Sequence, residues 1–167
     1  MALNKEALKT NLSKFMDPDS EGFEGSPANT EEFAEKFSKA ISDYVETIAP
    51  PMVPGTLTPA TAALKTALLG VGTLPNQLFP VVATVAMAAF SVAIALGMSA
   101  VPPQGSVVAL PPPPANLLGA SILASVMPLG IAKQPASVCV EALATTIDGW
   151  FKTGTAVVGG AAATPWS

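Results

Sequence analysis

The stretch PVVATVAMAAFSVAIALG, residues 80–97, decides the fold class of this chain. Thr84 and Ser91 are its only polar side chains, and its six alanines place small side chains on several sides of a helix. An apolar run of this length is too long for one strand and predicts a helix. Its alanines would let neighbouring helices approach closely, so we expect a central buried helix around which the remaining segments pack.

Formal charge is absent from a much longer region around that run. No charged residue occurs between Lys65 and Lys133, whereas residues 1–50 hold ten of the twelve acids and five of the eight lysines. Only 12% of the 167 residues are charged, about half of the usual quarter. The uncharged middle must therefore be core, a protein interface or a membrane segment, and another molecule should cover part of the exterior.

Residues 1–50 form an acidic segment in which two amphipathic helices are predicted. Apolar residues recur at helical spacing in both, as Leu3, Leu8, Leu12 and Phe15 in the first and as Phe33, Phe37, Ile41, Tyr44 and Ile48 in the second. The second helix should begin at Asn29 or Thr30, which places two glutamates in its first turn, where the helix dipole favours acids. The two prolines after Ala49 should end it.

Residues 51–152 should form an apolar helical core. Four more helices are predicted there, over residues 60–69, 74–98, 115–127 and 135–152. Thr58 is the expected N-cap of the first of these helices, with Pro59 at the first helical position. A proline-rich linker near 101–114 separates the second helix from the third, and residues 106–110 within it should be a short extended piece.

The tail, residues 153–167, is rich in Gly and Ala and cannot build a core of its own. We expect an extended C-terminal arm ending in Pro165 and Trp166. A free tail seldom ends in an exposed Trp, so the arm should either insert into a neighbouring subunit or wrap its own domain. The chain is thus predicted to be mainly α, a small bundle of about five to six helices with proline-rich linkers and this arm.

The residue types present argue against most kinds of site chemistry. All eight basic residues are lysines, and the chain contains no Arg and no His. Without Arg and with a net charge of −4, nucleic-acid binding is not expected. The commonest general base and metal ligand is missing, and the single Cys139 allows neither an internal disulfide nor a multi-cysteine metal site. We therefore expect a non-enzymatic protein without a metal or cofactor.

Acidic side chains nevertheless form three candidate groups, which are Glu31, Glu32 and Glu35, then Asp17, Asp19 and Glu21, and finally Glu141 and Asp148. The first group lies at the dipole-favoured start of a helix. The second follows a calcium loop only in part, because Pro18 interrupts it and Ala28 stands where the loop requires a Glu. We interpret the first group as a solvated helix face and the third as the polar face of the last helix, and we do not expect calcium at the second. Cys139 is interpreted as a small buried apolar residue.

Three parts of the sequence carry a family resemblance. The parts are residues 147–155 (IDGWFKTGT), residues 164–167 (TPWS), and the pair ALGM and VPP at 95–98 and 101–103. In composition and in the order of these parts, the chain resembles small virion structural proteins of tailed bacteriophages. The likeness covers roughly the C-terminal hundred residues. It implies a repeated component of a tail, baseplate, neck or capsid surface, in contact with other virion structural proteins. The start of the chain shows no secretory signal, so synthesis in the host cytoplasm and incorporation into the virion are expected.

Hydrophobic burial between subunits would drive such an assembly. The expected interface residues are Trp150, Phe151, Pro165, Trp166, Phe90 and Ile94. Five residues of the run 80–97 are expected as core or subunit contacts, namely Val81, Val85, Phe90, Ile94 and Leu96. The alternative is a small membrane-active protein, holin-like or pore-forming, that uses the apolar helices 80–97 and 115–127. The first lacks basic flanks and aromatic anchors and the second is short, so membrane contact is not the expectation.

Overall fold

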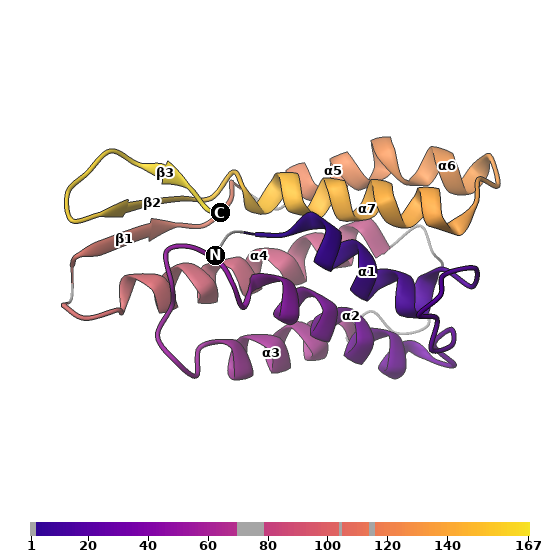
Figure 1. Cartoon of the computed structure of the whole chain (residues 1–167), viewed down its shortest axis with the longest axis horizontal. Coiled ribbons are helices and arrows are strands. Elements are labelled where there is room, and N and C mark those ends of the chain that lie inside the picture. The colour runs from indigo at the N-terminus through magenta and orange to yellow at the C-terminus, as the bar shows by residue number, and fades with distance from the viewer. Residues whose placement is uncertain (1–2, 70–78, 104, 114–115) are drawn as a thin grey trace.

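The structure is a computed structural model that describes residues 3–69, 79–103, 105–113 and 116–167. The described residues form six helices of ten residues or more, one short helix and three short strands (Figure 1). In chain order these are α1 (Lys5–Met16), α2 (Thr30–Val45), α3 (Leu57–Leu69), α4 (Phe79–Ser99), β1 (Val107–Leu110), α5 (Asn116–Ser125), α6 (Met127–Ile131), α7 (Ala136–Phe151), β2 (Thr155–Val158) and β3 (Thr164–Pro165). The prediction of a mainly α-helical bundle is confirmed.

The six longer helices form a closed ring around one core. α1 contacts α2, α2 contacts α3, α3 contacts α4, α4 contacts α5, α5 contacts α7, and α7 contacts α1 again. The short helix α6 adjoins α5 and α7. The strands pair in the antiparallel order β1–β2–β3 at one end of the bundle, where β1 contacts α4 (Figure 1).

The two N-terminal helices follow their predicted apolar stripes. α2 begins after the N-cap residue Asn29, and its Phe37, Ile41 and Tyr44 side chains are buried. In α1 the predicted stripe is likewise buried, and Phe15 packs edge-on against Phe33 of α2 with 6.1 Å between the ring centroids. Each helix therefore turns its one apolar face inward and leaves its charged face in water.

Residues from all three predicted segments contribute to a single core. Leu8 of the acidic segment, Phe90 of the apolar middle and Trp166 of the tail belong to the same cluster of buried side chains. The boundaries at 50 and 152 are therefore not boundaries between separate cores.

The ends of α3 and α4 differ from the prediction. α3 begins at Leu57, so Thr58 is inside the helix and Pro59 lies in its first turn, where a missing N–H costs nothing. α4 continues to Ser99 and does not end at Gly97. A Cβ at Gly97 would lie 2.4 Å from the Thr56 side chain, so this glycine permits a close approach of the chain ahead of α3. The start of the predicted helix 74–98 lies outside the described residues.

The C-terminal arm wraps its own domain, which was one of the two alternatives that the sequence left open. The predicted extended piece is β1, and β2 pairs with it so that Val107 lies opposite Val158. Two glycines with positive φ then turn the chain back into β3. The Trp166 side chain is fully buried, and its indole N–H donates to the Thr155 carbonyl at 3.1 Å. The arm is therefore an edge of the fold and not a projecting anchor.

Candidate functional site

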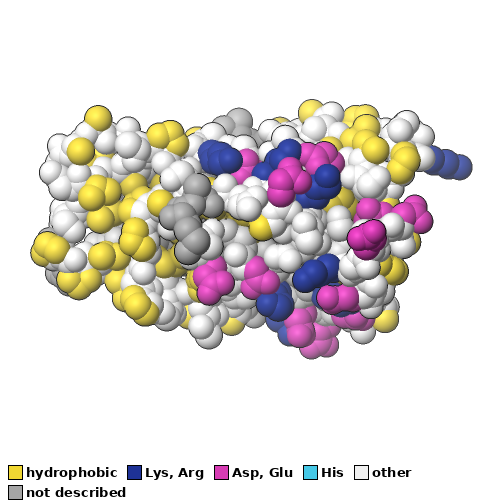
Figure 2. All heavy atoms as spheres, viewed as in Figure 1, with side chains coloured by type: hydrophobic (Ala, Val, Ile, Leu, Met, Phe, Trp, Pro, Cys, Tyr) yellow, Lys and Arg dark blue, Asp and Glu magenta, His cyan; other side chains and the backbone are white. Residues whose placement is uncertain are grey.

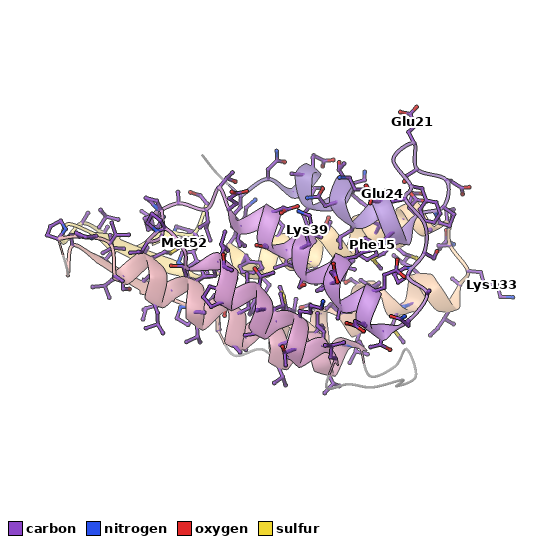
Figure 3. All side chains as sticks on the ribbon, turned by 90° about the horizontal axis from the view of Figure 1, so that it is seen from below. Phe15, Glu21, Glu24, Lys39, Met52 and Lys133 are labelled. Carbon is purple, nitrogen blue, oxygen red and sulfur yellow. The ribbon has the colours of Figure 1, made fainter. Side chains whose placement is uncertain are left out.

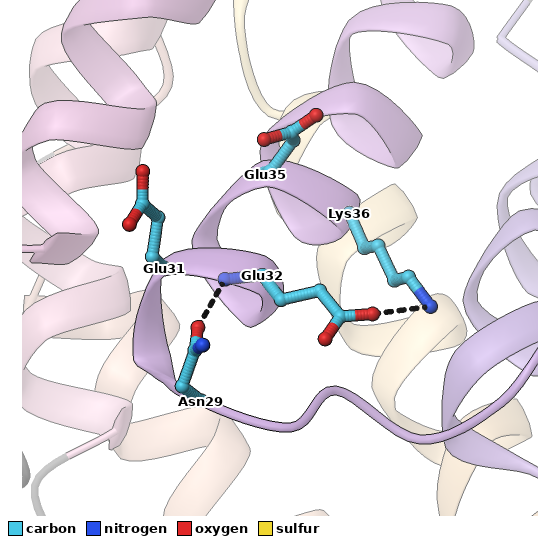
Figure 4. Close-up of a pocket in the computed structure, with 5 residues that line it drawn as sticks. All are labelled: Asn29, Glu31, Glu32, Glu35 and Lys36. Atoms are coloured by element: carbon cyan, nitrogen blue, oxygen red, sulfur yellow. Dashed lines mark hydrogen bonds and ion pairs between the residues drawn. The ribbon is translucent and has the colours of Figure 1, made fainter.

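The glutamates at the start of α2 line a shallow surface pocket together with Asn29 and Lys36 (Figure 4). The Asn29 side chain accepts a hydrogen bond from the Glu32 backbone N–H at 2.9 Å. The Glu32 carboxylate accepts one from the Ala28 N–H at 2.8 Å and pairs with Lys36 at 3.1 Å. The hydrogen bond from the Ala28 N–H, and to a smaller extent the one from the Lys36 side chain, lower the pKa of Glu32. This arrangement caps the helix, and it gives the Glu32 carboxylate a structural task.

Two further acids of the N-terminal segment, Asp17 and Glu35, also have partners within the fold. The Asp17 carboxylate accepts a hydrogen bond from the Asp19 backbone N–H at 3.2 Å, in the turn that follows α1. Glu35 of α2 pairs with Lys65 of α3 at 2.9 Å. Across the described ranges, no group of three or more His, Cys, Asp or Glu side chains is arranged to hold a metal ion.

The two carboxylates of α7 serve different neighbours. Glu141 accepts from Lys5 at 2.6 Å and pairs with Lys9 at 2.7 Å, both on α1, and hydrogen bonds from these two lysines lower its pKa to about 2. Asp148 instead accepts a hydrogen bond from the Tyr44 hydroxyl of α2 at 2.8 Å. Burial of Tyr44, together with this bond, raises the pKa of the phenol. Each carboxylate thus fastens α7 to a separate helix, and the two do not form a general acid–base pair.

The structure places most of the six residues expected at an interface in the core, which was the stated alternative for Phe90 and Ile94. Phe90, Ile94, Trp150, Phe151 and Trp166 are buried within the chain itself, and Pro165 in β3 is exposed. The Phe151 ring packs against the rings of Tyr44, Phe90 and Trp150. Large aromatic side chains are suited to an interface and to a core alike, and in this fold they lie in the core. The tail folds back and contributes Trp166 to that core.

One face of α4 exposes large apolar side chains to water. The exposed fractions are 53% for Val81, 66% for Val85, 46% for Val92 and 67% for Leu96. With Ala89, which is also exposed, these residues are spaced four, four, three and four apart, so they lie along one helical face. We call these five residues the α4 stripe. Val81, Val85 and Leu96 were expected as core or contact residues, and the structure places them on the surface.

The polar residues of α4 lie on its packed side. Thr84 and Ser91 are buried, and their hydroxyls donate to the backbone carbonyls of Pro80 and Ala88 within the same helix. A hydroxyl satisfied in this way can be buried at low cost. Because α4 is apolar on every side, hydrophobic periodicity alone cannot tell its exposed face from its buried face. The sequence signal that was missed is the recurrence of large side chains at Val92 and Leu96 on the face of Val81 and Val85.

Elements beside α4 expose further apolar side chains. In β1 the burial alternates, so Val107 and Ala109 face inward while Val108 and Leu110 face outward with 52% and 60% exposed. Leu123 of the adjoining helix α5 is also exposed. None of these elements carries a formal charge, because residues 66–132 contain no Asp, Glu, Lys, Arg or His. The α4 stripe thus belongs to an uncharged side of the molecule.

Charge is gathered on the other side and at the far end. On the face shown in Figure 2, lysines and acids lie over α1, α2 and the neighbouring part of α7, while the end that holds the strands shows none. In the perpendicular view, Glu21 and Lys133 project at the end opposite the strands (Figure 3). The uneven distribution of charge along the sequence therefore corresponds to two parts of the surface. One part is charged and well solvated, and the other is uncharged and poorly solvated.

No protein-family model matches the chain, and no curated protein or solved structure is detectably similar to it. Within the part of the chain that the structure describes, no helix combines the length and apolar character required of a membrane span. The α4 stripe is the feature of the described residues that most directly indicates an activity, which is association through burial of apolar surface.

Proposed function

We propose that this protein is a non-enzymatic structural subunit that packs against other protein subunits, as a repeated component of a tailed-phage virion. The observation that carries the proposal is the α4 stripe, whose four large side chains are 46–67% exposed on a side without formal charge. Contiguous apolar surface of this kind is typical of protein contacts. Covering it would stabilise a complex by about 25 cal/mol per Å² of apolar area, before ordering costs are subtracted.

A packing subunit benefits from a surface that is already ordered, and the fold supports this. On its inner side α4 is held by the buried Phe90 and Ile94 side chains. At its C-terminal end the Gly97 carbonyl accepts from the Val53 N–H at 3.0 Å, and the Ser99 hydroxyl accepts from the Ala109 N–H at 3.0 Å. The stripe would therefore enter an interface with little loss of conformational entropy.

The virion location is supported by the resemblance of residues 147–155 and 164–167 to phage structural proteins. The two segments adjoin in the fold, because the Trp166 ring lies against Gly154 and the Trp166 N–H donates to the Gly154 carbonyl at 2.8 Å. The two segments therefore pack against each other and together hold the C-terminal arm on the domain.

Targeted mass spectrometry of purified particles from the encoding phage tests this proposal. Trypsin cannot cut between Lys65 and Lys133, so the peptide 134–152 is the reporter. We expect it at a constant multiple-copy ratio to the major capsid protein, and we expect it to survive washing in high salt, because salt does not screen apolar contacts. Absence of the peptide from particles, or its removal by salt alone, would contradict the proposal.

A further inference from the structure

We propose that the partner on the α4 stripe is a second copy of this chain, with the two α4 helices packed antiparallel and crossing at Ala89. The inference rests on the proposed packing function and specifies its partner. Four features of the described residues carry it, namely the order of side chains along the stripe, its small central residue, its lack of charge and its extent.

The order of side chains along the stripe is nearly the same in both directions. Val81 and Val85 precede Ala89 by eight and four residues, and Val92 and Leu96 follow it by three and seven. At 1.5 Å per residue these are about 12 and 6 Å on one side and about 4.5 and 10.5 Å on the other. A two-fold axis through Ala89 would therefore bring Val85 against Val92 of the second copy, as a self-complementary interface requires.

The centre of the stripe is small where two crossing helices come closest. Ala89 lies between Val85 and Val92 and is itself exposed. An alanine at the crossing point allows interaxial distances near 8 Å, at the short end of the usual range of about 8–10 Å. The larger valines would then pack on either side of the crossing point, with Val85 of one copy against Val92 of the other.

Charge favours this side of the molecule for pairing with itself. A two-fold axis brings identical residues together, so a charged face meets like charges near the axis. Residues 1–50 hold ten of the twelve acids, and α1 and α2 would suffer this repulsion. The elements around the α4 stripe carry no formal charge between 66 and 132, so their self-association has no such cost.

The face made by α3, α4 and α5, whose one formal charge is Lys65 of α3, approaches the size that a stable dimer requires. The stripe from Val81 to Leu96 is about 22 Å long at the rise of an α-helix. α4 lies between α3 and α5 in the ring, and three neighbouring helices are about 25–30 Å wide at usual packing distances. The resulting projected area of about 600 Å² is comparable with the roughly 800 Å² that each partner buries in a standard interface.

Cysteine cross-linking of the full chain tests the predicted crossing. All variants carry Cys139→Ser, which removes the native thiol. Ala89→Cys alone should form a disulfide-linked dimer under mild oxidation, because its two copies would lie within the roughly 7 Å Cα separation that a disulfide tolerates. Ser137→Cys, exposed on α7, is the matched control for random collision.

A second pair of variants tests the direction of packing. Val85→Cys and Val92→Cys, carrying different tags, should cross-link when mixed. Each alone should not, because two copies of Val85 would be about 12 Å apart along the axis and two copies of Val92 about 9 Å. Thermal melting followed by circular dichroism establishes that each variant is folded.

The expected result is that Ala89→Cys cross-links about 100-fold faster than Ser137→Cys at about 10 μM protein, since the dimer holds its thiols at an effective concentration of about 1 mM. A rate no faster than the control, or Val85→Cys linking to itself as readily as to Val92→Cys, overturns the inference. If cross-linking fails while peptide 134–152 is present in particles, only the identity of the partner is wrong. If both fail, the proposed function fails as well.

Discussion

The Tyr44 hydroxyl donates a 2.8 Å hydrogen bond to Oδ1 of Asp148, and this buried contact joins α2 to α7 across the core. Asp148 is only 7% exposed, and its Oδ2 accepts from Lys152 at 2.8 Å, so both carboxylate oxygens have a partner. A buried carboxylate is tolerated only when it is paired in this way. The contact therefore fastens the acidic N-terminal segment to the C-terminal helix.

Removing the Tyr44 hydroxyl should destabilise the fold while keeping the ring. We expect Tyr44→Phe to lower the free energy of unfolding by about 1.5–3 kcal/mol, because the buried Asp148 loses a hydrogen-bond donor. Urea denaturation measures the change. Lys39→Met is the control, since Lys39 pairs with Asp43 on the surface at 2.9 Å, and its loss should cost at most about 1 kcal/mol. Equal effects of the two variants would show that the buried bond contributes no more than a surface pair.

Gly154 should not accept a side chain. A Cβ there would lie 2.5 Å from the Trp166 ring, so Gly154→Ala should cost about 1–3 kcal/mol through overpacking. Gly149→Ala is a matched control in α7, because a Cβ at Gly149 meets nothing within 4 Å and alanine favours a helix by about 1 kcal/mol. Opposite signs of the two changes in melting temperature are expected. Tolerance of alanine at Gly154 would mean that Trp166 does not dock there.

The role of the arm predicts that Trp166 contributes to stability and not to assembly. Trp166→Ala should lower the free energy of unfolding by about 3–5 kcal/mol, the usual cost of deleting a buried aromatic side chain. Cross-linking through Ala89→Cys should be retained at temperatures where the variant is still folded. Lost association at unchanged stability would instead show that the arm anchors a neighbouring subunit, as the sequence alone permits.

The ion pairs of Glu141 should make part of the stability sensitive to acid. Its pKa is lowered to about 2 in the folded protein by hydrogen bonds from Lys5 and Lys9, whereas an unperturbed Glu titrates near 4.3. A lowered folded pKa stabilises the fold above the unfolded pKa, and this contribution is lost as pH falls from about 4.3 to about 2. Glu141→Gln should therefore be less stable than wild type at pH 7 and equally stable near pH 2.

A double-mutant cycle controls the Glu141 experiment. In a chain that carries Lys5→Met and Lys9→Met, adding Glu141→Gln should change the melting temperature at pH 7 much less than it does in wild type, because the partners are already gone. An undiminished effect would assign the loss to helix α7 itself and not to the ion pairs.

The parts of the fold that could be predicted are those with one polar and one apolar face. Phe37, Ile41 and Tyr44 recur on one side of α2 while its charges occupy the other, so periodicity alone identifies the buried face. α7 was predictable for the same reason, and its Leu143 and Ile147 are buried as expected. In α4 no such contrast exists, so the helix was predictable and its exposed face was not.

The parts that could not be predicted depend on contacts distant in sequence. β2 is four residues long, and its pairing with β1 brings Val107 opposite Val158. No local pattern specifies such a pairing. The burial of Trp166 likewise depends on the space left by Gly154, which becomes apparent only in the folded chain. The same fold-back places Trp166, one of the expected interface residues, in the core.

The most direct test of the central claim, that protein covers the α4 stripe, is the mass of the protein purified without detergent. Size-exclusion chromatography with light scattering should give a species of defined mass that does not float with neutral or anionic lipid vesicles. Val85→Lys should lower that mass while the protein stays folded by circular dichroism, because Val85 is exposed in the single chain. Recovery only after detergent extraction of membranes, or flotation with the vesicles, would contradict the account and show that the stripe lies against lipid, as the membrane-active alternative requires.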